Sequence, residues 1–203
     1  MKIAISAMLV LVGLLAVGGG GCVMKEKVIE VVVTGETCAE YWEIHDSPVY
    51  STPAVVNYAN EIDMILQDND VDRGDIKKAV VTNAWYRVTD FNQGHDWLIT
   101  GQITVARNDI PSGTAALIEY TNQSVGEALG VTVPATLNGD GVSMLNQALT
   151  DYINWGNPIL TFTVVSGGVT PAPAADDPMI FGWEACIKMQ IVVEEDVDLP
   201  ELF

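Results

Sequence analysis

The alternation of apolar and polar residues along the chain predicts a mainly β protein. Seven strands are predicted from β-branched or alternating runs: residues 28–34, 39–44, 76–89, 97–106, 115–121, 158–165 and 179–193. Apolar residues at helical spacing predict a helix over residues 53–66 and another over residues 142–152. Thr52 is a suitable N-cap for the first helix, and Pro53 suits its first position.

These elements do not alternate in a regular strand–helix rhythm, which argues against a parallel sheet with crossover helices. The pattern favours an antiparallel β-sandwich of about seven strands with one or two short helices. A closed barrel is the alternative architecture.

The longest predicted strand, residues 76–89, has two faces of different character. One face carries the more apolar set: Val80, Thr82, Ala84, Tyr86 and Val88. Because this set is more apolar, we expect it to face the core. Trp85 lies in the other set and is therefore expected on the polar face of the strand.

The N-terminus begins with an apolar run over residues 3–17 behind the single basic residue Lys2. The run is too short to span a bilayer, which takes about 20 apolar residues, but it has the length of a secretory signal core. Four glycines and Cys22 follow. This arrangement resembles a bacterial lipoprotein signal, which implies that Cys22 becomes the lipidated first residue of the mature chain.

The resemblance departs from the family pattern at Gly19, where a lipoprotein signal usually carries a leucine-like residue. Ordinary secretion, with cleavage at an A-x-A-like site over residues 16–18, stays open, and so does an uncleaved hydrophobic segment. We divide the chain into a signal peptide (residues 1–21), an anchor and tether (22–27) and a single sandwich domain with an acidic C-terminal tail (28–203).

The chain is strongly acidic, with a formal net charge of −18. A nucleic-acid partner is excluded on this ground, because phosphate binding needs a basic surface. Direct adhesion to anionic headgroups is disfavoured as well. The membrane is therefore expected as a partner only through the N-terminal lipid, with the protein exported to the bacterial outer membrane, the periplasm or the cell surface.

Three cysteines are present. If Cys22 carries a lipid, Cys38 and Cys186 remain as an even pair. Disulfides persist in exported proteins, so these two residues are candidates for a bridge. Two buried free thiols, which pack as small hydrophobic side chains, are the alternative.

Four closely spaced aspartates are candidate ligands for a cation: Asp68, Asp70, Asp72 and Asp75. Ca²⁺ takes six to eight oxygen ligands, and the repulsion among close carboxylates would fall when it binds. The segment is not an EF-hand, because Arg73 replaces the required glycine and Ala79 the final glutamate. The hypothesis is a weak Ca²⁺ site, and a solvated acidic turn is the alternative. The NGDG segment at residues 138–141 is interpreted as a turn whose glycines supply positive φ.

Catalytic signatures do not emerge from the sequence. His45 and His95 each precede an aspartate, but a zinc site or a catalytic triad needs further groups at suitable spacing. Trp85 is the candidate among five tryptophans for stacking on a ligand, with core packing as the alternative for all of them.

The order of leader, short helix, long IKKAVVTNAWYRVTD strand, LTDYINWG helix and closing strands resembles bacterial lipoproteins of unknown function with a late-embryogenesis-abundant-like β-sandwich domain. That resemblance implies a fold and carries no catalytic residues. We therefore expect a lipid-anchored envelope protein with a structural or protein-interaction role, no catalysis and no cofactor. The alternative is a carbohydrate- or calcium-binding module on the cell surface.

Overall fold

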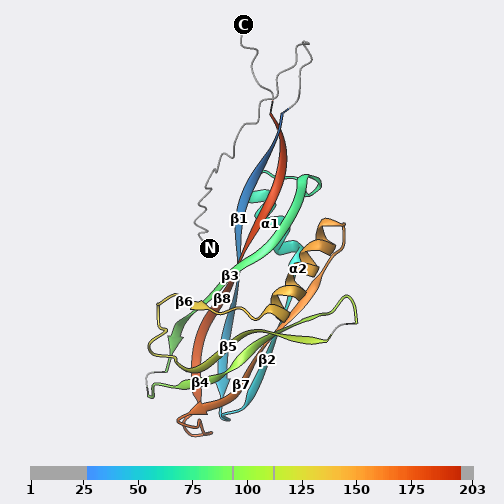
Figure 1. Ribbon diagram of the computed structural model, residues 1–203. Coiled ribbons are helices and arrows are strands. Elements are labelled where there is room, and N and C mark those ends of the chain that lie inside the picture. Colours follow the sequence, from blue (N-terminus) through green and yellow to red (C-terminus); the bar gives the residue numbers. More distant parts are fainter. Residues whose placement is uncertain (1–26, 93, 112, 198–203) are drawn as a thin grey trace, which may run out of the picture.

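The computed structural model describes residues 27–92, 94–111 and 113–197, and over these ranges the fold is mainly β. Eight strands in this part of the chain form two four-stranded sheets, in which every paired strand is antiparallel. The expected sandwich-like class is confirmed (Figure 1). The predicted leader, Cys22 and nearly all of the tether lie outside the described residues.

The first sheet has the order β1 (Lys27–His45), β8 (Met179–Val197), β3 (Ile76–Phe91) and β6 (Val133–Ala135). The second has the order β2 (Tyr50–Asn57), β7 (Ile159–Thr170), β4 (Leu98–Arg107) and β5 (Thr114–Ser124). The helices are α1 (Tyr58–Asp68), the 3₁₀ turn η1 (Arg73–Asp75) and α2 (Gly139–Ile153).

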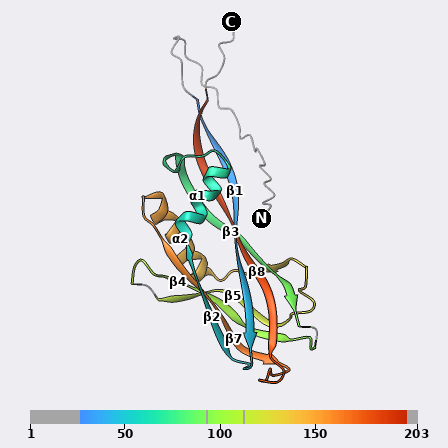
Figure 2. The same ribbon diagram turned by 180° about the vertical axis from the view of Figure 1, so that it is seen from behind.

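Strands β1 and β8 are the longest elements and pair residue for residue, from Lys27 opposite Val197 to His45 opposite Met179. At the Lys27 end they form a two-stranded ribbon that projects beyond the helices, as Figures 1 and 2 show from opposite sides. The His45 end of β1 lies among the other strands at the far end of the molecule.

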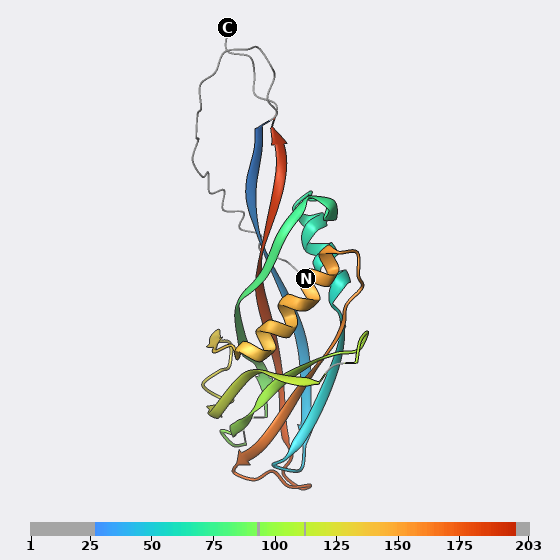
Figure 3. The ribbon, with the colours of Figure 1, turned by 45° about the vertical axis from the view of Figure 1, so that its right-hand side comes forward.

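The core lies between the sheets and beneath the helices. Helix α2 contacts β3 of the first sheet and β4 and β5 of the second, so it bridges the two layers (Figure 3). Helix α1 contacts β1 and β7, again one strand from each sheet. Both helices turn an apolar stripe inward, which places these side chains in the core: Tyr58, Ile62, Leu66, Leu145, Leu149 and Tyr152.

The first helix starts later than the sequence predicted. Residues 50–57 form β2, which pairs with β7, and Asn57 is the N-cap whose side chain accepts a hydrogen bond from the Asn60 amide. Val55 is exposed on this strand instead of lying on a helix face. The prediction failed because residues 55–57 (VVN) fit both the helical and the strand spacing of apolar residues. Their pairing with β7 makes them part of a strand.

The predicted faces of the long strand β3 are only partly correct. Its register shifts between Val81 and Asn83. Before the shift the odd-numbered Val81 is buried, and beyond it the even-numbered Ala84 and Val88 are buried. A β-bulge adds a residue and reverses the alternation of faces. Val80 and Thr82, predicted to face inward, therefore point outward relative to Val81.

The NGDG segment is a helix start, which corrects its interpretation as a turn. Asn138 is the N-cap of α2, and its side chain accepts a hydrogen bond from the Asp140 amide. Gly139 and Gly141 lie in the first helical turn. Gly141 is buried, and a β-carbon there would lie 2.5 Å from the Ala116 carbonyl oxygen.

We expect Gly141→Ala to lower the free energy of unfolding by about 1–3 kcal/mol, the usual cost of overpacking a tight contact. The neighbouring atoms belong to the backbone of β5, so they cannot rotate away. Gly139→Ala is the matched control, because a β-carbon at Gly139 meets nothing within 4 Å. Urea denaturation of both variants measures the difference, and equal stabilities would contradict the close packing of α2 on β5.

Candidate functional site

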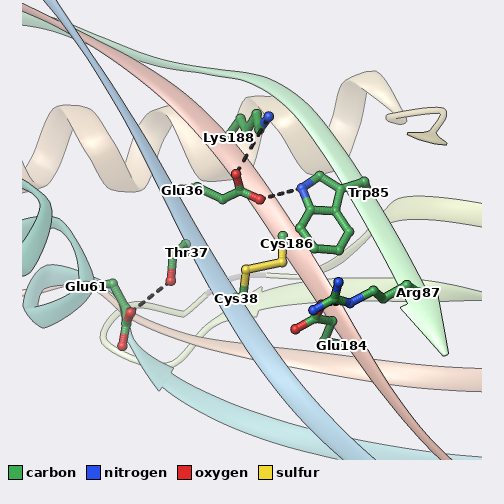
Figure 4. The surroundings of a disulfide bond; sticks show 9 residues. All are labelled: Glu36, Thr37, Cys38, Glu61, Trp85, Arg87, Glu184, Cys186 and Lys188. Atoms are coloured by element: carbon green, nitrogen blue, oxygen red, sulfur yellow. Dashed lines mark hydrogen bonds and ion pairs between the residues drawn. A yellow bond between two sulfur atoms is a disulfide. The ribbon is translucent and has the colours of Figure 1, made fainter. Parts of the chain in front are cut away.

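The outer face of the β1-β8-β3-β6 sheet carries the disulfide near its middle. Cys38 and Cys186 lie directly opposite each other on β1 and β8 and are joined by an S–S bond of 2.03 Å. The pairing that the sequence left open is thus the one present in the structure. Cys38 is exposed, whereas Cys186 is fully buried, with Trp85 of β3 paired opposite it (Figure 4).

Charged side chains flank the disulfide on this face. On one side, Glu36 accepts a hydrogen bond from the Trp85 indole and lies 3.7 Å from the Lys188 ammonium group. On the other side, Arg87 forms an ion pair with Glu184 (Figure 4). Glu40 lies opposite Glu184 on β1, so the three strands bring a guanidinium and two carboxylates into one row.

Trp42 lies in the next row of the same face and is 57% exposed. It is paired with Gly182, and a β-carbon at Gly182 would lie 2.9 Å from two atoms of the six-membered indole ring. The indole therefore covers the glycine, which has no side chain to push it away. Ile44, two residues further along β1, is 59% exposed. We call the outer surface formed by Ile44, Trp42, Glu40, Glu184, Arg87, Trp85, Glu36 and Lys188 the Trp42 face.

Trp85 is on the outer face, as predicted, but it is only partly accessible. Its indole nitrogen is engaged with Glu36, and the Arg87 guanidinium carbon lies 5.8 Å from its ring centroid. Trp42 presents more of its surface, and sequence reasoning did not single it out. The signal that could have found it is the alternation of exposed residues along one unbroken β1.

The remaining tryptophans divide between core and surface. Trp97 and Trp183 are buried, in line with the core-packing alternative. Trp155 is 73% exposed at the end of α2, where the Arg73 guanidinium carbon lies 4.9 Å from its ring centroid. Arg73 also donates hydrogen bonds to the carbonyl oxygens of Tyr152 and Gly156, so it caps this helix end.

The two histidines each pair with a carboxylate. His95 forms a 2.6 Å contact with Asp177 in an exposed loop region. His45 bonds the buried Glu43 over 2.5 Å and stacks on Tyr50 at 3.7 Å between ring centroids. The Glu43 carboxylate also accepts hydrogen bonds from Thr52 and Trp183, so it is enclosed by three donors.

The buried Glu43 changes the electrostatics of nearby tyrosines. Burial, and to a lesser extent the Glu43 carboxylate, raises the pKa of Tyr41 to about 12. Burial is also the main cause of the raised pKa of Tyr50 and Tyr120, to which Glu43 adds. These phenols stay protonated at neutral pH and are poorly suited to act as general bases.

The four aspartates of the acidic turn are all exposed and lie on different local structures. Asp68 ends α1, Asp70 has a φ of 57°, Asp72 is the N-cap of η1, and Asp75 lies within it. Among the described residues, only Glu36, Cys38 and Cys186 have three ligand atoms within 4.8 Å of one another, and both of those sulfurs belong to the disulfide. The structure does not gather the aspartates into a site, and Ca²⁺ binding stays a prediction.

Two cavities between the sheets are small, at about 50 and 90 Å³. The smaller is walled by aromatic side chains that include Tyr50, Tyr86 and Tyr120. The larger lies behind the disulfide and is lined by Tyr58, whose buried hydroxyl has no hydrogen-bond partner. Neither has the several hundred Å³ typical of a ligand pocket, so the open Trp42 face is the stronger candidate.

No family model matches the chain, and no curated protein matches it. In the described part of the chain, neither helix combines the length and the apolar character that crossing a membrane would require. The class of this protein is therefore defined by its fold and its surface alone: an acidic, disulfide-linked, two-sheet β protein with an open aromatic face.

Proposed function

We propose that the chain is an exported, lipid-anchored envelope protein that binds a partner through the Trp42 face and performs no catalysis. The observation that carries this proposal is the exposure of Trp42 and Ile44 together on one sheet face. Aromatic side chains and arginine are the groups that dominate binding surfaces, and Arg87 lies in the adjacent row.

Export is supported by the chemistry of the cysteines. A disulfide between Cys38 and Cys186 fits an oxidising compartment, where such bonds persist. The apolar leader and the glycines before Cys22 fit removal of a signal peptide followed by lipidation. An acidic surface keeps such a protein soluble above the membrane.

The direction of β1 supports binding away from the membrane. From Lys27, close to the proposed anchor, fifteen residues of strand lead to Trp42, a span of roughly 50 Å. Trp42 lies three residues before the His45 end of β1, and that end of the strand lies far from the ribbon where the described chain begins (Figures 1 and 2). An anchored chain would thus present this face to partners beyond the lipid surface.

The anchor is tested by fractionation and mass spectrometry of the protein produced in a bacterial host. We expect the wild-type chain in the membrane fraction, with a mature N-terminus at a diacylglycerol-modified Cys22. Cys22→Ser should move the protein out of that fraction, because one lipid attachment site is lost. A mature chain that begins at Gly19 with an unmodified Cys22 would refute lipid anchoring.

A further inference from the structure

We propose that the Trp42 face binds an uncharged polysaccharide, with one sugar ring stacked on the Trp42 indole and the chain running along β8 toward Trp85. This inference rests on the proposed binding function and names its ligand class. It goes beyond that function because the proposed binding role alone does not specify the chemistry of the partner.

The geometry of Trp42 suits a sugar ring. Gly182 lets two atoms of the indole lie close over β8, while Trp42 stays 57% exposed to solvent. The C–H groups on one side of a pyranose form an apolar patch that covers such a flat aromatic ring. Trp42 lines neither of the two cavities between the sheets.

The next row supplies groups for sugar hydroxyls. Glu40 and Arg87 lie in the next row along the strands from Trp42, one same-face step of roughly 7 Å away. Glu184 lies between them in that row, but it is only 8% exposed and is paired with Arg87. Carboxylates accept hydrogen bonds from hydroxyl groups, and the guanidinium donates them. Hydroxyl groups carry both functions, so they complement this mixed row better than an apolar partner does.

Trp85 extends the surface to a second position. Trp42 pairs with Gly182 and Trp85 with Cys186, four residues apart on β8, and the two tryptophans belong to the strands on either side of β8. The two positions are therefore about 13 Å apart along β8 and about 10 Å apart across it, or roughly 16 Å in all. A short run of sugar units would cover both indoles and pass over the charged row between them. The half-buried Trp85 is the weaker of the two platforms.

Charge selects an uncharged ligand. The chain carries a net charge of −18, and on this face Glu36, Glu40 and Glu184 outnumber the cations Arg87 and Lys188. An anionic polysaccharide would be repelled, and so would a second copy of the same acidic face. A neutral glycan meets no such penalty.

The test is binding of the detergent-solubilised full-length lipoprotein to cellulose, chitin and starch, with alginate as an anionic control. We expect at least one neutral polymer to retain the protein and alginate not to. Trp42→Ala should reduce retention at least tenfold. Gly182→Ala, which keeps the indole but displaces it from the sheet, should also weaken retention.

Trp155→Ala is the matched control, because Trp155 is even more exposed but lies at the end of α2. Its retention should equal that of the wild type, and circular dichroism should show all variants folded. The inference is overturned if none of the neutral polymers binds, or if Trp42→Ala and Trp155→Ala behave alike. If Trp42→Ala instead abolishes capture of an envelope protein while no polymer binds, the glycan is wrong and the binding function stands.

Discussion

Replacing Glu43 by alanine should lower the free energy of unfolding by about 3–5 kcal/mol, because it removes the buried acceptor of three hydrogen bonds, each of which costs about 1–3 kcal/mol when its partner is lost. The Glu43 side chain has no exposed surface and accepts hydrogen bonds from Thr52 at 2.7 Å and Trp183 at 3.4 Å, besides its contact with His45. Alanine would leave these three groups without their shared acceptor. Urea denaturation followed by tryptophan fluorescence gives the free energy directly.

Two variants make the measurement specific. Glu43→Gln keeps the shape and one acceptor oxygen, so its loss should be smaller, about 1–3 kcal/mol. Glu40→Ala removes an exposed carboxylate from the same strand and should change stability by less than about 0.5 kcal/mol. If Glu43→Ala costs no more than Glu40→Ala, the buried carboxylate does not hold β1 and β2 to the core.

The sequence predicted an element correctly where the apolar residues kept one pattern, helical, alternating or continuous, along the whole segment. The helix at residues 139–153 was found because Leu145 and Leu149 recur at helical spacing and both are buried. The strand β7 was found because β-branched residues alternate over residues 159–165, and β8 was found because residues 179–193 form a long, largely apolar run. In these segments the local pattern and the final packing agree, so no tertiary information was needed.

The pattern failed where pairing partners decided the outcome. One strand, β1, was predicted as two because residues 35–38 interrupt the β-branched pattern, yet β8 pairs with every residue from Lys27 to His45. The strands β2 and β6 were missed because their conformation depends on β7 and β3. These two missed strands, and the merging of two predicted ones, explain why the described residues form eight strands where about seven were expected.

The sequence predicted a tryptophan on an outer sheet face, but it did not predict which tryptophan is most exposed there. The correct face of Trp85 followed from simple alternation near that residue, although the bulge at Val81–Asn83 reversed it further upstream. Trp42 was missed because its prominence depends on Gly182, which lies 140 residues away in the sequence and opposite it in space. Alternation along β1 could place Trp42 on the outer face, but the glycine opposite it has no signal in the sequence near residue 42.

Removal of the disulfide should cause the second large loss of stability. Replacing both Cys38 and Cys186 by alanine is expected to lower the free energy of unfolding by about 2–5 kcal/mol. The bond closes a loop of 148 residues, so it restricts nearly the whole unfolded chain, and loop-closure entropy gives an upper figure of about 5 kcal/mol. The native register does not depend on it, because β1 and β8 are paired along their full lengths.

Two observations should accompany that loss. The dependence of the free energy on urea concentration should become steeper, because an unfolded chain without the cross-link exposes more surface. Reduced wild-type protein should behave like the double variant, since both lack the same restriction. If the double variant is as stable as the oxidised wild type, the bond does not constrain the unfolded chain, and the stability of the β1–β8 pair comes from strand pairing and core burial alone.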